Sequence, residues 1–140
     1  DRDSFTGRGA IWVALVSYAE DNLLTGAGFA SFWRIGSASP IFQYTDSLAT
    51  LLGHGHNGYL DILVTTGIVG LLLSVWGFIL GPMGRSARSA AAPIVFPVIV
   101  FFAAQNFAES SLINVDTPPW FLLIFAIGLL QASGPRRVNG

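Results

Sequence analysis

Two histidines stand directly before an uninterrupted apolar run. The stretch HGHNGYLDILVTTGIVGLLL begins at His54 and ends at Leu73. The Asn-Gly pair after His56 predicts a turn, and the apolar run that follows is long enough to enter a membrane. Histidine exchanges a proton near neutral pH. The stretch therefore predicts titratable groups at the edge of a lipid phase, where they suit chemistry on a lipid-anchored substrate.

Charged side chains elsewhere in the chain could complete such a site. The full set of candidates is Arg8, Arg34, His54, His56, Asp61 and Glu109. Arginine stays protonated and binds phosphate through paired hydrogen bonds. These residue types suit a reaction in which a sugar leaves a lipid diphosphate and a hydroxyl attacks. Arginine would neutralise the leaving diphosphate, and histidine would accept the hydroxyl proton.

Each candidate also has a purely structural interpretation. A loop arginine such as Arg8 is often solvated or paired. His56 could simply cap the following helix, and the spacing of His54, His56 and Asp61 is only a weak metal pattern. Asp61 could be an acid favoured by the dipole of a helix N-terminus. Glu109 stands in an apolar segment, where carboxylates are rare, so it is either functional or the partner of a basic group such as Arg8.

The composition indicates a membrane protein or part of one. Of the 140 residues, 52% are hydrophobic and 11% are charged, whereas about a quarter are charged in soluble domains. The net charge of −1 gives no sign of nucleic-acid binding, and without cysteine this sequence has no disulfide or thiolate metal site. DRDSFTGRG at the start has no apolar core like that of a signal peptide. We therefore expect a fragment of a longer protein.

Residues 1–58 predict an extracytoplasmic loop with one amphipathic helix. Within 9–24, apolar residues recur every four positions, from Ile11 to Leu23, and acids lie on the other side. This helix is too short to span a membrane, and two interpretations stay open: it lies along the membrane surface, or it packs on a protein core.

A loop rich in glycine and serine follows the helix over residues 26–40. Its aromatic residues Phe29, Phe32 and Trp33 are expected to anchor it at the membrane interface. Residues 41–53 predict either a short helix or a continuation of this loop.

Three transmembrane helices are predicted in the second half of the chain, over 59–80, 93–112 and 119–132. The segment 81–93 is expected to break the first helix, and 133–140 is expected to be a cytoplasmic tail. In the first helix, Thr66, Gly70 and Ser74 recur every four residues, and such a small-residue stripe lets another helix approach closely. The fold class is thus all-α, a polytopic membrane fragment.

Arginines set the expected topology. Three alternating spans place the following residues on one side: Arg85, Arg88, Arg136 and Arg137. The positive-inside rule makes that side cytoplasmic. Both histidines, Glu109 and residues 1–58 then face outward.

Four motifs resemble a known family over roughly residues 5–132. They are TGRGAIW, GAGFASFW, HNGYLDILVTTGIVGLLL and NFAESS, and they look like the C-terminal half of the O-antigen ligase and polysaccharide polymerase superfamily. The resemblance implies a multi-pass bacterial inner-membrane glycosyltransferase with its active face toward the periplasm. Such an enzyme moves a glycan from undecaprenyl diphosphate to a glycan or lipid acceptor, with no metal, cofactor or nucleotide sugar. The resemblance leans toward exopolysaccharide polymerases rather than lipid A-core ligases.

The resemblance also implies roles for particular residues. Arg8 falls on an arginine thought to bind the diphosphate, and His56 falls on the family's essential histidine. Asn57, in the same HN match, and Glu109, at a recurrent acidic position, are expected to bind substrate. Arg34, which has no firm motif match, is expected to assist Arg8.

Two other classes of function stay open. In a transporter or channel, Asn106 and Glu109 would line a polar path in a span broken at Pro97. In a structural membrane anchor, Arg8, His56 and Glu109 would lie scattered. Convergence of these three side chains would count against the anchor.

Overall fold

The computed structural model describes residues 8–29, 31–33, 38–45 and 53–134, and every regular element in these ranges is a helix. The elements are α1 (Arg8–Asp21), the short 3-10 helix η3 (Pro40–Gln43), α2 (Gly58–Val75), the π-helix η5 (Trp76–Leu80), α3 (Gly81–Ser86), α4 (Ala92–Gln105) and α5 (Pro118–Ala132). The predicted all-α fold is confirmed. Arg34, most of 41–53 beyond η3, and the end of the predicted tail lie outside the described residues.

One helical run has the length and composition to cross a membrane. It extends over 29 residues from Gly58 to Ser86 and combines α2, η5 and α3. The other apolar helices of the described chain, α4 and α5, contain 14 and 15 residues. The three predicted spans therefore stay a prediction.

The expected break in 81–93 occurs, but the helix continues past its predicted end at Leu80 as far as Ser86. Pro82 has no amide hydrogen to give to the preceding turn, yet it lies in the first turn of α3. The π-turn just before it makes this possible: the Gly81 amide donates to the Trp76 carbonyl, five residues back. A π-bulge shifts the hydrogen-bond ladder by one residue, and the run ends at Ser86 instead of Leu80.

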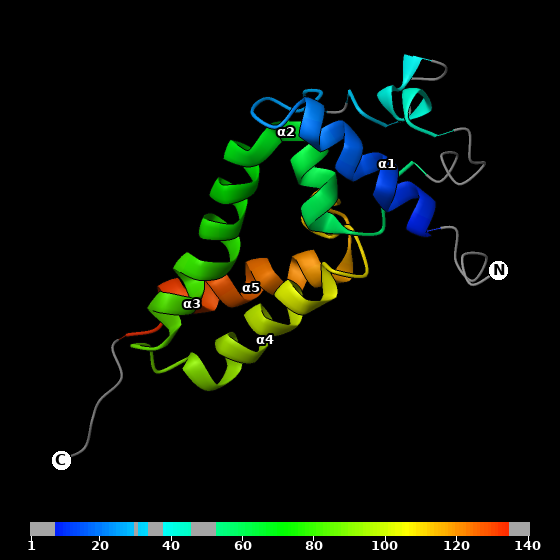
Figure 1. The fold of residues 1–140 in the computed structure, drawn as a ribbon. Coiled ribbons are helices and arrows are strands. Elements are labelled where there is room, and N and C mark those ends of the chain that lie inside the picture. The colour runs from blue at the N-terminus through cyan, green and yellow to red at the C-terminus, as the bar shows by residue number, and fades with distance from the viewer. Residues whose placement is uncertain (1–7, 30, 34–37, 46–52, 135–140) are drawn as a thin grey trace.

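A real interruption occurs earlier, at Gly67, where φ is 70° and ψ is −174°. Figure 1 shows α2 changing direction between a first half beside α1 and a second half that leads down to α3. The predicted span 59–80 is therefore not one rod. The part beyond the break, 68–86, measures roughly 28 Å at 1.5 Å per residue, close to the thickness of a bilayer core.

The loop after α1 covers the ends of both halves of α2. Ala27 and Gly28 donate backbone hydrogen bonds to the carbonyls of Val64 and Thr65, each at 2.8 Å, and the amide of Ile68 donates to the carbonyl of Leu23 at 2.7 Å. These bonds satisfy carbonyls and an amide that a broken helix leaves without intrahelical partners. The interruption at Gly67 is thus stabilised by the loop after α1.

Two glycines allow the loop and α2 to come this close. A Cβ atom at Gly67 would lie 2.2 Å from the Leu24 carbonyl oxygen, and one at Gly26 would lie 2.7 Å from the Thr65 carbonyl carbon. Both glycines also have positive φ, 70° and 60°. Neither position can accept a side chain without moving the backbone.

Two hydrophobic cores hold the helices together. The first packs α1 against the first half of α2 and includes Leu15, Phe32 and Val64. The second packs the later half of the run against α4 and α5, with Phe102 and Leu123 fully buried. Figure 1 shows α4 and α5 lying side by side, in agreement with their contacts. The first core holds the loops near α1, and the second is the helical body.

The packing settles one open question about α1. Its apolar positions Ile11, Leu15 and Ala19 are buried as predicted, whereas Leu23, just beyond the helix, is 48% exposed. This face packs on the protein and not on a lipid surface. Phe32 is also fully buried, so its expected place as an interface anchor is wrong.

The second predicted helix ends early. α4 stops at Gln105 rather than at residue 112 because Asn106 reverses the chain: its Nδ2 donates to the Phe102 carbonyl, and its Oδ1 accepts from the Leu112 amide, both at 2.7 Å. α4 continues through Pro97 without a break, contrary to the transporter interpretation. α5 begins one residue before the predicted start and ends at the predicted position.

Small residues of α2 line an apolar groove of about 500 Å³. Thr66, Gly70 and Ser74 form one wall, and Phe29 and Trp120 contribute to the others. The predicted small-residue stripe therefore faces this groove.

Gly67→Ala should destabilise the protein strongly, because it adds a forced contact with Leu24 to a backbone strain of about 1–3 kcal/mol. The measurement is the melting temperature of the intact protein in detergent. Gly128→Ala is the matched control, because a Cβ there meets nothing within 4 Å. Equal melting temperatures for the two variants would contradict the close crossing at Gly67.

Candidate active site

His56 occupies the short loop that leads into α2. Its φ of 52° places it in the left-handed region, which is costly for a residue with a side chain. The next residue, Asn57, is the N-cap of α2: its Oδ1 accepts from the amides of Tyr59 and Leu60, both at 3.1 Å. The helix start therefore fixes the chain directly after His56.

Glu109 lies in the turn between α4 and α5, outside any helix, so its expected place inside a spanning helix is wrong. Its Oε2 lies 3.3 Å from His56 Nδ1, and its Oε1 lies 3.9 Å from a terminal nitrogen of Arg8. Arg8 is the first residue of α1. Three candidate residues from three separate segments thus meet around one carboxylate.

The three side chains remain accessible. Their exposed fractions are 37% for Arg8, 49% for Glu109 and 19% for His56. Exposed ion pairs contribute about 0–1 kcal/mol, so the Arg8–Glu109 pair adds little to stability. A ligand can therefore reach both charges and compete with this pair.

Backbone contacts hold the histidine loop against the turn that carries Glu109. The Gly58 amide donates to the carbonyls of Asn106 at 2.8 Å and of Glu109 at 3.0 Å. A Cβ at Gly58 would lie 2.2 Å from the Asn106 Oδ1. The glycine after the histidine-asparagine pair is thus required by the closeness of the two segments.

Asp61 was a candidate because of its charge, but the sequence did not reveal its structural role. It is fully buried and accepts hydrogen bonds from the Gly55 amide at 2.9 and 3.0 Å, from Trp33 Nε1 at 3.0 Å, and from the Ser110 hydroxyl. A favourable place at a helix N-terminus does not require such burial. The available signal was a lone acid within an otherwise apolar helical run.

A further hydrogen bond reaches the same loop from α1. Trp12 Nε1 donates to the Gly55 carbonyl at 2.8 Å, so Gly55 is held through both its amide and its carbonyl. A Cβ there would lie 2.6 Å from Leu15 Cδ1. The residue before His56 is therefore tightly enclosed.

The remaining candidates have other placements. His54 packs edge-on against His56, with ring centroids 4.1 Å apart, and the described residues contain no group of three potential metal ligands. Asn57 is only 8% exposed, and its Nδ2 lies 3.5 Å from the Phe107 carbonyl. Its side chain caps α2 and joins it to the turn, which is a positioning role. Arg34 lies outside the described residues.

Comparison with known proteins identifies the family. The model of the O-antigen ligase family matches residues 1–75, which include α1 and the histidine loop. The chain belongs to the O-antigen ligase family. The match also ends near the close of α2, so it covers Arg8 and His56 but not Glu109.

A curated relative extends this similarity to most of the chain. The exopolysaccharide production protein ExoQ of Rhizobium meliloti (strain 1021) is 26% identical over 144 residues, covering 96% of this chain and 33% of ExoQ. The chain thus spans about a third of the length of this relative. No solved structure matches the chain. Its place in the superfamily that the four motifs resembled is confirmed.

The closeness of the histidine loop and the turn can be tested by cross-linking. The chain contains no cysteine, so His56→Cys combined with Glu109→Cys should be joined by a short bismaleimide in an otherwise cysteine-free protein. Arg85→Cys combined with Glu109→Cys is the control, because α4, roughly 21 Å long, separates α3 from the turn. Gel mobility after cleavage between the two positions reports the link. Equal cross-linking of both pairs would contradict the observed arrangement.

Proposed function

We propose that this chain supplies catalytic groups of a membrane glycosyltransferase that moves a glycan from a polyprenyl diphosphate, of the undecaprenyl type, to an acceptor hydroxyl. The observation that supports this most is the meeting of Arg8, His56 and Glu109. A structural membrane anchor has no need to bring a cation, an imidazole and a carboxylate together at an accessible place. A transporter would hold such groups along the middle of its helices, whereas these lie in a loop, in a turn and at a helix start.

Arg8 is suited to the diphosphate. It opens α1, where the helix dipole adds positive potential to that of the guanidinium. The charge of Arg8 is only loosely matched by Glu109 at 3.9 Å. A diphosphate carries more negative charge than one carboxylate, so it would displace Glu109 from Arg8. The guanidinium of Arg8 would then neutralise part of the diphosphate's negative charge.

His56 is suited to activate the acceptor. With its Nδ1 hydrogen directed at Glu109, its Nε2 is free to accept the proton of the acceptor hydroxyl. The acceptor oxygen bonds to the anomeric carbon while the bond from that carbon to the diphosphate oxygen breaks with its electron pair. The configuration inverts, and the diphosphate leaves on its lipid. Glu109 stabilises the imidazolium until the proton passes to water.

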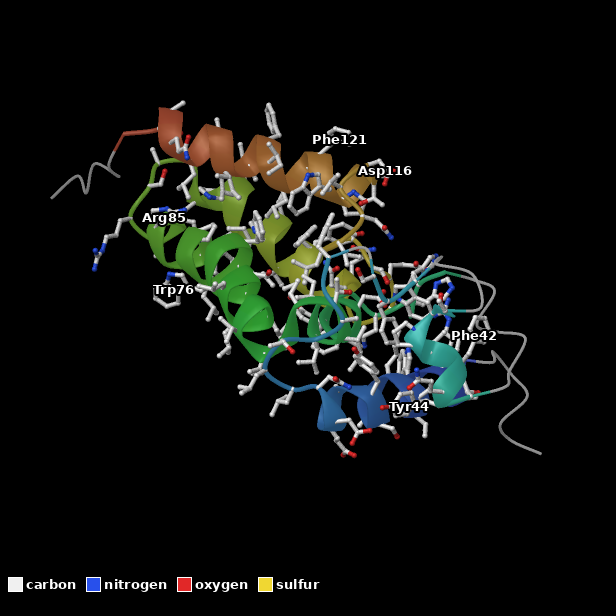
Figure 2. The ribbon with its side chains drawn as sticks, turned by 90° about the horizontal axis from the view of Figure 1, so that it is seen from above. Phe42, Tyr44, Trp76, Arg85, Asp116 and Phe121 are labelled. Atoms are coloured by element: carbon white, nitrogen blue, oxygen red, sulfur yellow. The ribbon has the colours of Figure 1, made fainter. Side chains whose placement is uncertain are left out.

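A membrane setting fits the surface of the helical body. Large apolar side chains project outward, including Leu72, Leu73, Trp76 and Phe121. Figure 2 shows Arg85 at the end of the molecule opposite Phe42 and Tyr44. Arginine near that end agrees with a cytoplasmic side there. The site would then face the periplasm of a bacterial inner membrane, with α2–α3, α4 and α5 as spanning helices.

The similarity to ExoQ favours polymerisation of an exopolysaccharide as the reaction. The donor would be a lipid-linked oligosaccharide, and the acceptor a hydroxyl of a second glycan. The remaining two-thirds of such a protein would complete the lipid and glycan sites, because this chain corresponds to 33% of the relative.

His56→Ala in the intact protein should abolish long glycan products, because loss of a general base costs about 10²–10⁴-fold in rate. Glu109→Gln should give a smaller loss, since the imidazole remains. Asp116→Asn, an exposed acid of the same connection, should behave like wild type. Product length on gels, with expression matched by immunoblot, is the measurement. Unchanged long-chain glycan in His56→Ala would refute the catalytic role.

Arg8→Ala should raise KM for the lipid-linked donor by roughly 10- to 100-fold, because a hydrogen bond to a charged group contributes about 1.5–3 kcal/mol. Arg8→Lys should recover part of this, since it keeps the charge but loses the paired geometry. Arg88→Ala, a cation beyond α3, is the control. The measurement is the initial rate as a function of donor concentration. An unchanged KM for the donor in Arg8→Ala would contradict a role of Arg8 in binding the diphosphate.

A further inference from the structure

We infer that Asp61 is a positioning residue that fixes His56 and Glu109 relative to each other. This inference rests on the function proposed above and extends it to a group that does not touch substrate. Asp61 has no exposed surface, so it acts only through the residues that it holds.

Two of the three residues that donate to Asp61 are chain neighbours of the two reactive side chains. Gly55, whose amide binds both carboxylate oxygens, directly precedes His56. Ser110, whose hydroxyl binds Oδ2, directly follows Glu109. One carboxylate therefore ties together two segments that lie 53 residues apart at their reactive positions.

The backbone of His56 shows why such a tie is needed. Its φ of 52° is costly for histidine and persists only where the surroundings enforce it. On one side, Gly55 is held by Asp61 and Trp12; on the other, Asn57 caps α2. Without the Asp61 bond, the Gly55 amide loses its side-chain acceptor, and the His56 ring is free to leave Glu109.

The contact between His56 and Glu109 is itself too weak to keep this geometry. It measures 3.3 Å and involves a carboxylate that is 49% exposed. The bonds from Gly55 and Ser110 to Asp61 are buried, where hydrogen bonds are electrostatically stronger than in water. The alignment of the reactive pair thus depends on the buried carboxylate behind it.

Ser110→Ala tests this inference with Ser111→Ala as the matched control. The two serines are adjacent and equally buried, at 3% and 2% exposure, but only Ser110 binds Asp61. Because small misplacements of catalytic groups cost up to about 100-fold, kcat of the intact protein should fall on the order of 10- to 100-fold in Ser110→Ala. KM for the lipid-linked donor should change far less, since Arg8 is untouched. Ser111→Ala should keep the wild-type kcat.

Asp61→Asn and Asp61→Ala supply a conservative rescue. Asparagine keeps an oxygen for the Gly55 and Trp33 hydrogen bonds, and its amide can donate to the Ser110 hydroxyl. It should therefore retain much more kcat than alanine at matched expression and melting temperature. If alanine fails to fold, the comparison of the two serine variants still decides.

The possible results separate this inference from the proposed function. Equal kcat in Ser110→Ala and Ser111→Ala, with His56→Ala inactive, overturns the role of Asp61 and leaves the catalytic role of His56 intact. A parallel loss in both serine variants, with lowered melting temperatures, also overturns it, because the effect is then on stability alone. Full activity in His56→Ala overturns the proposed function itself.

Discussion

A carboxylate with no exposed surface has to be surrounded by hydrogen-bond donors, and this requirement organises the part of the molecule that contains the site. Asp61 takes its donors from the loop before α2, from the loop after α1 and from the turn after α4. A hydrogen bond to a charged group contributes about 1.5–3 kcal/mol. The three segments are therefore held in place together, and the side chains that they carry come together with them.

Much of the helical body follows from apolar patterning alone. The predicted 119–132 helix differs from α5 by one residue, and the buried positions of α1 follow its four-residue repeat. The errors arise where a contact that apolar patterning does not encode interrupts, ends or extends a helix. Gly67 interrupts an apolar run because the loop at Leu24 packs against it. Asn106 ends α4 by binding the Leu112 amide.

The residues of the site likewise fall into those that the sequence predicted and one whose role it did not. Arg8, His56 and Glu109 were recognisable by residue type and motif, because reactive groups retain a chemical signature in sequence. Asp61 was not, since an acid at a helix start has a sufficient local explanation. Its partners Trp33 and Ser110 lie 28 and 49 residues away. These neutral donors reach the carboxylate only in the folded chain, and nothing in the local sequence around the tryptophan or the serine indicates that contact.

The strengths of the contacts suit their different tasks. Between Arg8 and Glu109 the charges are exposed and 3.9 Å apart, so an incoming anion can separate them at little cost. Behind them, the bonds at Asp61 are buried and involve groups that no ligand reaches. A site that exchanges ligands needs surface contacts that break easily when a ligand binds. It keeps its geometry only if other, buried contacts hold His56 in place. The buried carboxylate meets that need because it holds the chain beside each reactive residue and leaves the reactive atoms themselves free.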